Sequence, residues 1–128
     1  MIYLDSSVAL AQLLAEDRSP PDAIWQEPLI ASRLLEYEIW VRLNARALGR
    51  SHGELARMLI GRVALIELTP TVLARALEPF PAPVRTLDAL HLASIAFLRA
   101  SGQVLKLATY DERLAAGARA LEIPLVPL

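Results

Sequence analysis

Three of the five aspartates stand where carboxylates could take part in chemistry. Asp5 directly follows a short apolar run, Asp111 follows another such run by three residues, and Asp88 lies in an apolar segment typical of a helix. In open parallel sheets, sites form beyond the carboxyl ends of strands, near a switch point in strand order. We therefore expect Asp5 and Asp111 to lie at that edge. The structural alternative is that each only caps the helix or turn that follows.

Asp88 also has a structural alternative, because a carboxylate in the first turn of a helix is favoured by the helix dipole. Its neighbours Leu87 and Ala89 are nevertheless apolar. A buried carboxylate is costly unless it is paired, hydrogen-bonded or bound to a metal. We therefore include Asp88 among the candidate site residues. Asp17 and Asp22 lie in a proline-rich segment and are interpreted as solvated.

A fourth carboxylate comes from the helix predicted over residues 33–48. Glu36 and Glu38 stand two residues apart in it, so they point to nearly opposite sides. Each shares its stripe with apolar residues, and periodicity favours Glu38 only weakly as the member of the site. Either face could belong to the core, and the other could bury against a partner subunit.

Three or four carboxylates brought close together repel one another, and one holds its proton unless a cation intervenes. Clusters that offer only oxygen suit Mg²⁺ or Mn²⁺. Such a site can activate water and neutralise a phosphate oxygen in phosphodiester cleavage. The chain has no cysteine, which excludes a thiolate zinc site and a cysteine nucleophile. It also lacks the glycine motifs that cradle nucleotides.

Several polar residues stand close to these acids in the sequence. His91 follows Asp88 by three residues and shares its helix face. A lone histidine in an apolar helix is more often a hydrogen-bonded core residue than a ligand, and we interpret His91 in this way. Ser7 and Thr109 are interpreted as caps or as hydrogen-bond partners of the carboxylates.

Short apolar runs alternate with helical segments along the whole chain. Strands are predicted over residues 2–4, 29–31, 63–68, 104–108 and 123–126, and helices over residues 8–15, 33–48, 51–61, 70–77, 87–100 and 112–121. Caps are expected at Ser6 or Ser7, Ser32 and Thr86, and Gly49 is expected to close the second helix. This alternation predicts an α/β fold with a mostly parallel sheet. The prolines that flank the last strand predict an edge position.

Composition narrows the class of protein. The 128 residues fit a single domain, and a hydrophobic content of 55% rules out a disordered chain. No segment resembles a signal peptide or a membrane span, so we expect a soluble cytoplasmic protein. The net charge of −1 means that any contact with nucleic acid must come from a local patch.

Arginines provide the candidate patch. Arg42, Arg46 and Arg50 recur at four-residue spacing and could hold RNA phosphates beside a metal site. The alternative is an ordinary solvated face. Twelve of the thirteen basic residues are arginines, a bias that genome composition can equally produce.

Four segments carry a resemblance to a known family. They are residues 2–7 (IYLDSS), 31–38 (ASRLLEYE), 85–93 (RTLDALHLA) and 108–114 (ATYDERL). In this order, and over nearly the whole chain, they resemble the motifs of PIN-domain proteins, and more narrowly those of VapC-type toxin ribonucleases of type II toxin–antitoxin systems. The third segment is the most specific match.

The resemblance implies a PIN-like fold, with a parallel sheet of about five strands and helices on both sides. It implies a metal-dependent endoribonuclease in which Asp5, Glu38, Asp88 and Asp111 hold Mg²⁺ or Mn²⁺, directly or through water. Ser7 and Thr109 match small polar positions that support these acids.

The resemblance further implies a homodimer, an RNA substrate (tRNA, rRNA or mRNA) and a cognate antitoxin protein that blocks the acidic site. Two alternatives stay open. One is a catalytically inactive PIN-like module that binds RNA or protein, and the other is a housekeeping metal-dependent nuclease. The presence of all four acids argues against the first, because binding alone needs no repulsive cluster.

Overall fold

The computed structural model describes residues 1–128 and contains one parallel sheet of four strands. The strands are β1 (Ile2–Leu4), β2 (Leu29–Ser32), β3 (Val63–Ile66) and β4 (Lys106–Ala108). Their order across the sheet is β3-β2-β1-β4. β1 is an inner strand with all three residues buried, and it pairs in parallel with β2 on one side and with β4 on the other. This confirms the predicted α/β class and the parallel sheet.

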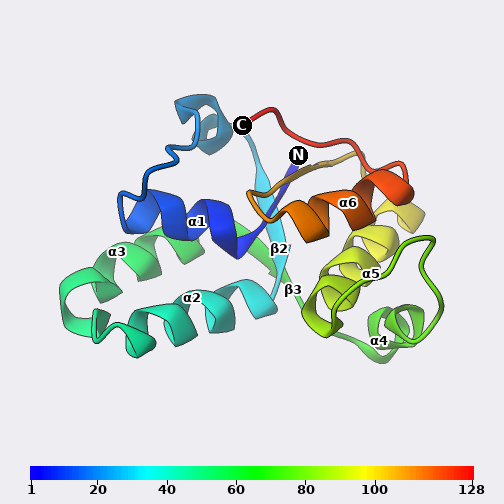
Figure 1. Cartoon of the computed structure of the whole chain (residues 1–128), viewed down its shortest axis with the longest axis horizontal. Coiled ribbons are helices and arrows are strands. Elements are labelled where there is room, and N and C mark those ends of the chain that lie inside the picture. Colours follow the sequence, from blue (N-terminus) through cyan, green and yellow to red (C-terminus); the bar gives the residue numbers. More distant parts are fainter.

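Helices cover both faces of the sheet. They are α1 (Ser6–Leu13), α2 (Leu34–Ala45), α3 (Gly49–Gly61), α4 (Pro70–Ala76), α5 (Thr86–Ala100) and α6 (Glu112–Ala120), with a short 3₁₀ helix η1 (Asp22–Gln26) before β2. Figure 1 shows α1, α2 and α3 grouped on one side of the strands and α4, α5 and α6 on the other. The chain adds β2 and β3 on one side of β1 and then places β4 on the other side of β1. Because crossovers between parallel strands are right-handed, this reversal of direction puts the later helices on the opposite face of the sheet.

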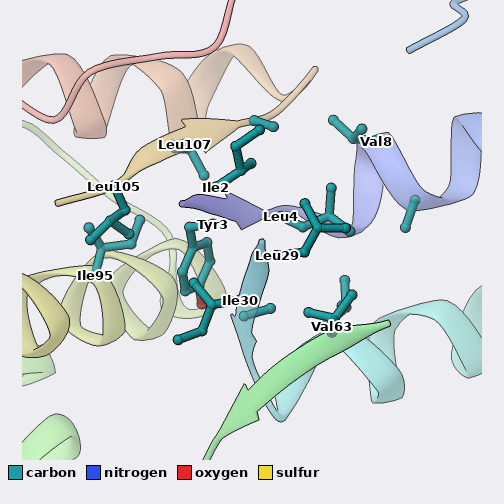
Figure 2. Packing of buried hydrophobic residues seen from close by; sticks show 14 of the residues in the cluster. Ile2, Tyr3, Leu4, Val8, Leu29, Ile30, Val63, Ile95, Leu105 and Leu107 are labelled. Carbon is teal, nitrogen blue, oxygen red and sulfur yellow. The ribbon is translucent and has the colours of Figure 1, made fainter. Parts of the chain in front are cut away.

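The core forms where the apolar strands meet the two groups of helices. Side chains in β1 alternate between the faces of the sheet. In Figure 2, Tyr3 points from β1 toward α5, whereas Leu4 lies on the side of α1. Both side chains are fully buried. The central strand is therefore packed on both faces, and this packing fixes the backbone position of Asp5, the residue that follows it.

The predicted fifth strand over residues 123–126 is reduced to a single parallel bridge between Leu107 and Leu125. Leu107 N–H donates to Pro124 O at 2.9 Å, and Val126 N–H donates to Leu107 O at 2.8 Å. Pro124 and Pro127 have no N–H groups to extend this ladder. The sheet therefore has four full strands and one bridged segment, in keeping with the prediction of about five.

Several predicted helix ends were wrong. The helix α2 ends at Ala45, and a turn that includes Ala47 at a positive φ of 54° precedes Gly49, which begins α3 instead of closing α2. The side chain that caps α1 is Asp5 itself, which accepts the Ser7 N–H, and not a serine.

The two other predicted caps also differ from the structure. Arg85 occupies the N-cap position of α5, so Thr86 is already helical. Arg33 occupies the N-cap position of α2 without a side-chain cap bond. Ser32, one residue before this N-cap position, nevertheless accepts the Leu34 N–H on its Oγ at 3.3 Å.

Candidate metal centre

The candidate site lies where the strand order reverses. From β1 the chain crosses to β2, whereas β4 lies on the opposite side of β1, so the carboxyl ends of β1 and β4 form a topological switch point. Asp5 follows β1, and its N–H donates to Ala108 O at the end of β4 at 3.0 Å. Thr109 directly follows β4, and Asp111 comes two residues later. The predicted meeting of Asp5 and Asp111 at one sheet edge is therefore a consequence of the strand order.

Two hydroxyl groups hold one oxygen of Asp5. Ser7 Oγ donates to Asp5 Oδ2 at 2.6 Å, and Thr109 Oγ1 donates to the same oxygen at 2.7 Å. The other oxygen, Oδ1, accepts no hydrogen bond from the protein. Burial raises the pKa of the Asp5 carboxyl above its usual value, and the bonds from Ser7 and Thr109 offset part of this effect. Asp5 is thus fixed through one oxygen and leaves the other for a ligand.

The hydroxyls of Ser7 and Thr109 also tie two loops together. Tyr110 N–H donates to Ser7 Oγ at 2.9 Å, and Asp111 N–H donates to Thr109 Oγ1 at 2.9 Å. The turn after β4 is therefore connected through side chains to the start of α1. The structure places both residues in the supporting positions that the sequence predicted for them.

Glu38, and not Glu36, belongs to the site. Glu38 Oε1 lies 2.7 Å from His91 Nε2, and Oε2 accepts a longer bond of 3.4 Å from Ser6 Oγ. Glu36 instead pairs with Arg33 at 3.4 Å, one turn before it on the helix surface. Packing thus places Glu38 on the face of α2 that contacts His91 and Glu36 on a different face, a distinction that periodicity made only weakly.

His91 connects Glu38 to the core. Its Nδ1 lies 2.8 Å from Tyr3 Oη, and Tyr3 Oη accepts the buried Ser32 N–H at 3.1 Å. Burial lowers the pKa of His91, but interactions with Tyr3 and the Glu38 carboxylate outweigh it and raise the pKa to about 10. Both ring nitrogens are hydrogen-bonded, so the imidazole orients Glu38 and has no free lone pair in this arrangement. This agrees with the interpretation of His91 as a hydrogen-bonded core residue.

One oxygen of Asp5, one of Glu38 and a ring nitrogen of His91 all lie within 4.8 Å of one another. Because His91 is engaged on both sides, the carboxylates of Asp5 and Glu38 are the donors available to a cation. Carboxylate oxygens fit a hard divalent ion such as Mg²⁺ or Mn²⁺, which completes its shell with water. The donor chemistry therefore fits the ion expected from the sequence.

Asp88 and Asp111 are both paired with Arg85. The Arg85 guanidinium donates from Nε to Asp88 Oδ2 at 3.0 Å and from Nη2 to Asp111 Oδ2 at 2.6 Å. Burial raises the pKa of Asp111, but the N–H groups at the start of α6 and the Arg85 charge outweigh it and hold that pKa below its usual value. Asp88 is 5% exposed and pairs with Arg85 across its own helical turn. The four predicted acids thus form two pairs.

All four acids line one cleft with a volume of about 740 Å³. Its walls carry six acidic side chains and three arginines, Arg18, Arg42 and Arg85. Arg46 and Arg50 do not line it, because α2 ends at Ala45 and Arg50 lies in α3. The predicted arginine stripe therefore does not continue along one helix, and Arg42 is its only member at the cleft.

Sequence reasoning missed three residues of this region. Arg18 donates to Tyr110 O at 3.2 Å and stacks over the Tyr110 ring. Tyr3 was assigned only to a buried strand, although its hydroxyl supports His91. Arg85 was quoted in a motif without a role. Its position three residues before Asp88 is the one signal that could have indicated an ion pair.

Comparison with known proteins identifies the class. A model of the PIN domain family matches residues 2–120, so the chain belongs to this family. Among its curated relatives is ribonuclease VapC47 of Mycobacterium tuberculosis, 32% identical over 126 residues that cover 93% of this chain and 90% of the relative. Ribonuclease VapC46 of the same species is 30% identical over 130 residues, with 98% and 95% covered. The expected resemblance to VapC-type proteins is confirmed.

Solved structures confirm the fold. A toxin–antitoxin complex from Klebsiella pneumoniae contains a chain that aligns with a TM-score of 0.70 at 17% identity, covering 99% of this chain and 97% of its own. VapC20 of M. tuberculosis, described as a toxin that cleaves the sarcin–ricin loop, aligns with a TM-score of 0.66 at 20% identity, covering 91% and 94%. In this chain, none of the helices is both long and apolar enough to cross a membrane.

Proposed function

We propose that this chain is a single PIN domain that acts as a VapC-like toxin: a Mg²⁺- or Mn²⁺-dependent endoribonuclease that hydrolyses RNA phosphodiester bonds. The observation that carries the proposal is the pairing of Asp5 with Glu38 at the switch point of the sheet, in a cleft that also holds Asp88 and Asp111. The curated ribonuclease relatives support the same activity.

In this mechanism, Asp5 and Glu38 would hold the divalent ion, and Asp88 and Asp111, which line the same cleft, would assist. The ion, when bound, supplies positive charge to the scissile phosphate and makes a water molecule more acidic. Ser7 and Thr109 fix Asp5, and His91 fixes Glu38, so both carboxylates are already oriented in the cleft.

Arginines at the cleft are suited to the rest of the substrate. Arg42 and Arg18 line the cleft, and their guanidinium groups can form bidentate bonds to RNA phosphates. Aromatic residues make up only 5% of the chain and offer little surface for base stacking. We therefore expect contacts with the RNA backbone to dominate binding. Binding should therefore weaken steeply as salt is raised.

We also propose that a cognate antitoxin protein blocks the cleft. We further propose that the toxin is a homodimer and that it acts in the cytoplasm. A solved structural neighbour comes from a toxin–antitoxin complex, which supports a partner of this kind. The test for the partner is whether a small protein encoded beside this gene binds the chain and stops RNA cleavage.

The test of the activity is cleavage of a mixed RNA pool by antitoxin-free protein, with Mg²⁺, with Mn²⁺ and with EDTA. We expect cleavage only with the ions. Glu38→Gln should lose at least 100-fold in rate, whereas Glu36→Gln, its neighbour on the other face of α2, should retain activity. Full activity of Asp5→Asn and Glu38→Gln would refute the proposal. Absence of both cleavage and metal binding would favour an inactive binding module.

A further inference from the structure

Arg18 brings a positive charge to the cleft without pairing with an acid. It is exposed and lines the cleft, and the ion pairs of the chain all involve other basic residues, although Glu16 and Asp17 directly precede it. Its guanidinium group instead reaches the turn after β4, where Nη1 donates to Tyr110 O at 3.2 Å. Nε and Nη2 bond no acceptor in the protein. The charge and two of the three guanidinium nitrogens are therefore available to a ligand.

The ring of Tyr110 gives this guanidinium group a fixed place. Arg18 Cζ lies 4.7 Å from the ring centroid, within the range of a cation–π contact. Tyr110 is itself half-buried against the core, and its N–H donates to Ser7 Oγ at 2.9 Å. It directly follows Thr109, whose hydroxyl bonds Asp5. The stacked pair is thus anchored beside the acids of the candidate site.

A planar cation on an aromatic ring suits a particular kind of ligand. Unpaired RNA bases stack on aromatic side chains and on the planes of arginine guanidinium groups. Tyr110 covers one face of the Arg18 guanidinium, and the other face is accessible because Arg18 is exposed. Among the residues that line the cleft, only Tyr110 and His91 are aromatic, and His91 is buried. An RNA strand whose phosphate lies at the acids therefore finds one place for a base in this cleft.

We propose that Arg18, stacked on Tyr110, forms a subsite for an unpaired nucleobase of the RNA. The base stacks on the open face of the guanidinium group, and the free Nε and Nη2 groups still reach a phosphate. Tyr110 acts as a positioning residue that holds the guanidinium plane in place. The proposal rests on the proposed function, because it assigns a base contact to the cleft in which the RNA backbone is bound.

The experiment measures the binding of two fluorescein-labelled RNA octamers to the full-length protein by fluorescence anisotropy, at low salt and with EDTA to prevent cleavage. One octamer is oligoadenylate, and the other has the same sugar–phosphate backbone without bases. Both carry the same charge, so the difference between them reports base contacts. We expect the wild type to bind oligoadenylate at least about 5-fold more tightly, the lower end of what stacking of one base contributes.

Variants locate the base contact. Arg18→Lys keeps the charge but removes the guanidinium plane, so it should bind the two octamers almost equally. Tyr110→Leu should do the same, because the guanidinium group loses its support. Arg57→Lys is the matched control, since Arg57 stacks over Trp40 outside the cleft, and Tyr37→Leu removes an exposed tyrosine outside it. Both controls should keep the wild-type preference.

Equal binding of the two octamers by the wild type, or binding of neither, would overturn the proposal. A full preference in Arg18→Lys would also overturn it, and this exposed variant decides the matter even if Tyr110→Leu does not fold. RNA cleavage with Mg²⁺ is measured on the same wild-type preparation. Cleavage without a base preference would leave the proposed function intact and reject only the subsite, whereas a base preference without cleavage would support the subsite and reject the nuclease.

Discussion

Hydroxyl groups position the acidic side chains of the candidate site, and one of these hydroxyls, that of Tyr3, is buried in the core. Tyr3 Oη accepts the Ser32 N–H and contacts His91 Nδ1, which in turn positions Glu38 through Nε2. The site is therefore connected to the central strand through a chain of hydrogen bonds. A substitution that touches no carboxylate can disturb it.

Tyr3→Phe should lower the free energy of unfolding by about 1–3 kcal/mol, because it leaves the buried Ser32 N–H without an acceptor. Urea denaturation measures this change. Tyr37→Phe is the matched control, since Tyr37 is 62% exposed and should be neutral. An unchanged unfolding midpoint for Tyr3→Phe would mean that the hydroxyl carries no stabilising bond.

Thr109 has a comparable role at the mouth of the site. Thr109→Val keeps the shape of the side chain but removes the hydroxyl that donates to Asp5 and accepts from Asp111 N–H. We expect Mn²⁺ affinity to fall about 10–100-fold, as for other partners of metal ligands. Thr109→Ser should retain most of the affinity. Equal binding by the valine variant in a Mn²⁺ titration would contradict this role.

At this scale the sequence predicted that the four acids lie together, as they do in one cleft, but not how they pair. Asp5 and Asp111 were found from their places after apolar runs, and Asp88 from its apolar surroundings. The bond from Arg85 to Asp111 joins the starts of two helices that are distant in sequence, and its length is set by how α5 packs on α6. No local pattern encodes that distance.

At the scale of elements, α5 and α6 pack closely enough to require a glycine. A Cβ atom on Gly117 would lie 2.8 Å from Leu92 Cδ1 and 3.2 Å from Val84 Cγ1. Leu92 is fully buried, so it has little room to move. The small residue in α6 therefore allows Asp111, at the start of this helix, to approach Arg85.

Overpacking in Gly117→Ala should lower the free energy of unfolding by about 1–3 kcal/mol. The higher helix propensity of alanine should offset about 1 kcal/mol of this loss. Thermal or urea unfolding measures the net loss. Gly61→Ala, at the end of α3, is the control because an added Cβ meets nothing within 4 Å, and it should be neutral or slightly stabilising. Stabilisation by both substitutions would show that the α5–α6 contact yields easily.

Element types were predictable here and element ends were not. Alternating apolar runs and helical stretches gave the right order of strands and helices. The prediction that Gly49 closes the second helix was wrong. Glycine is common after a helix, but here the chain turns at Ala47 and Gly49 begins α3. The last strand shortened to one bridge because two prolines limit its ladder. Both outcomes depend on tertiary contacts that a local pattern does not contain.

For the whole molecule, the proposed metal site predicts that stability depends on divalent cations. A divalent ion that binds only the folded chain stabilises it by mass action, by about 2.7 kcal/mol at a free concentration 100 times the dissociation constant. We therefore expect Mg²⁺ or Mn²⁺ to raise the thermal unfolding midpoint and EDTA to reverse the rise. Asp5→Asn should show little or no rise. An equal rise in that variant would indicate ion binding elsewhere on the surface.

The strand order also determines when the site can exist. The hydrogen bond from Thr109 to Asp5 joins residues 104 positions apart, and β4 completes the sheet beside β1. A growing polypeptide presents the first acids early, but they lack their hydroxyl partners until residue 109 has left the ribosome. Domains fold as units during synthesis. A nascent chain of this topology therefore has no formed acidic cleft until almost the whole domain has been synthesised.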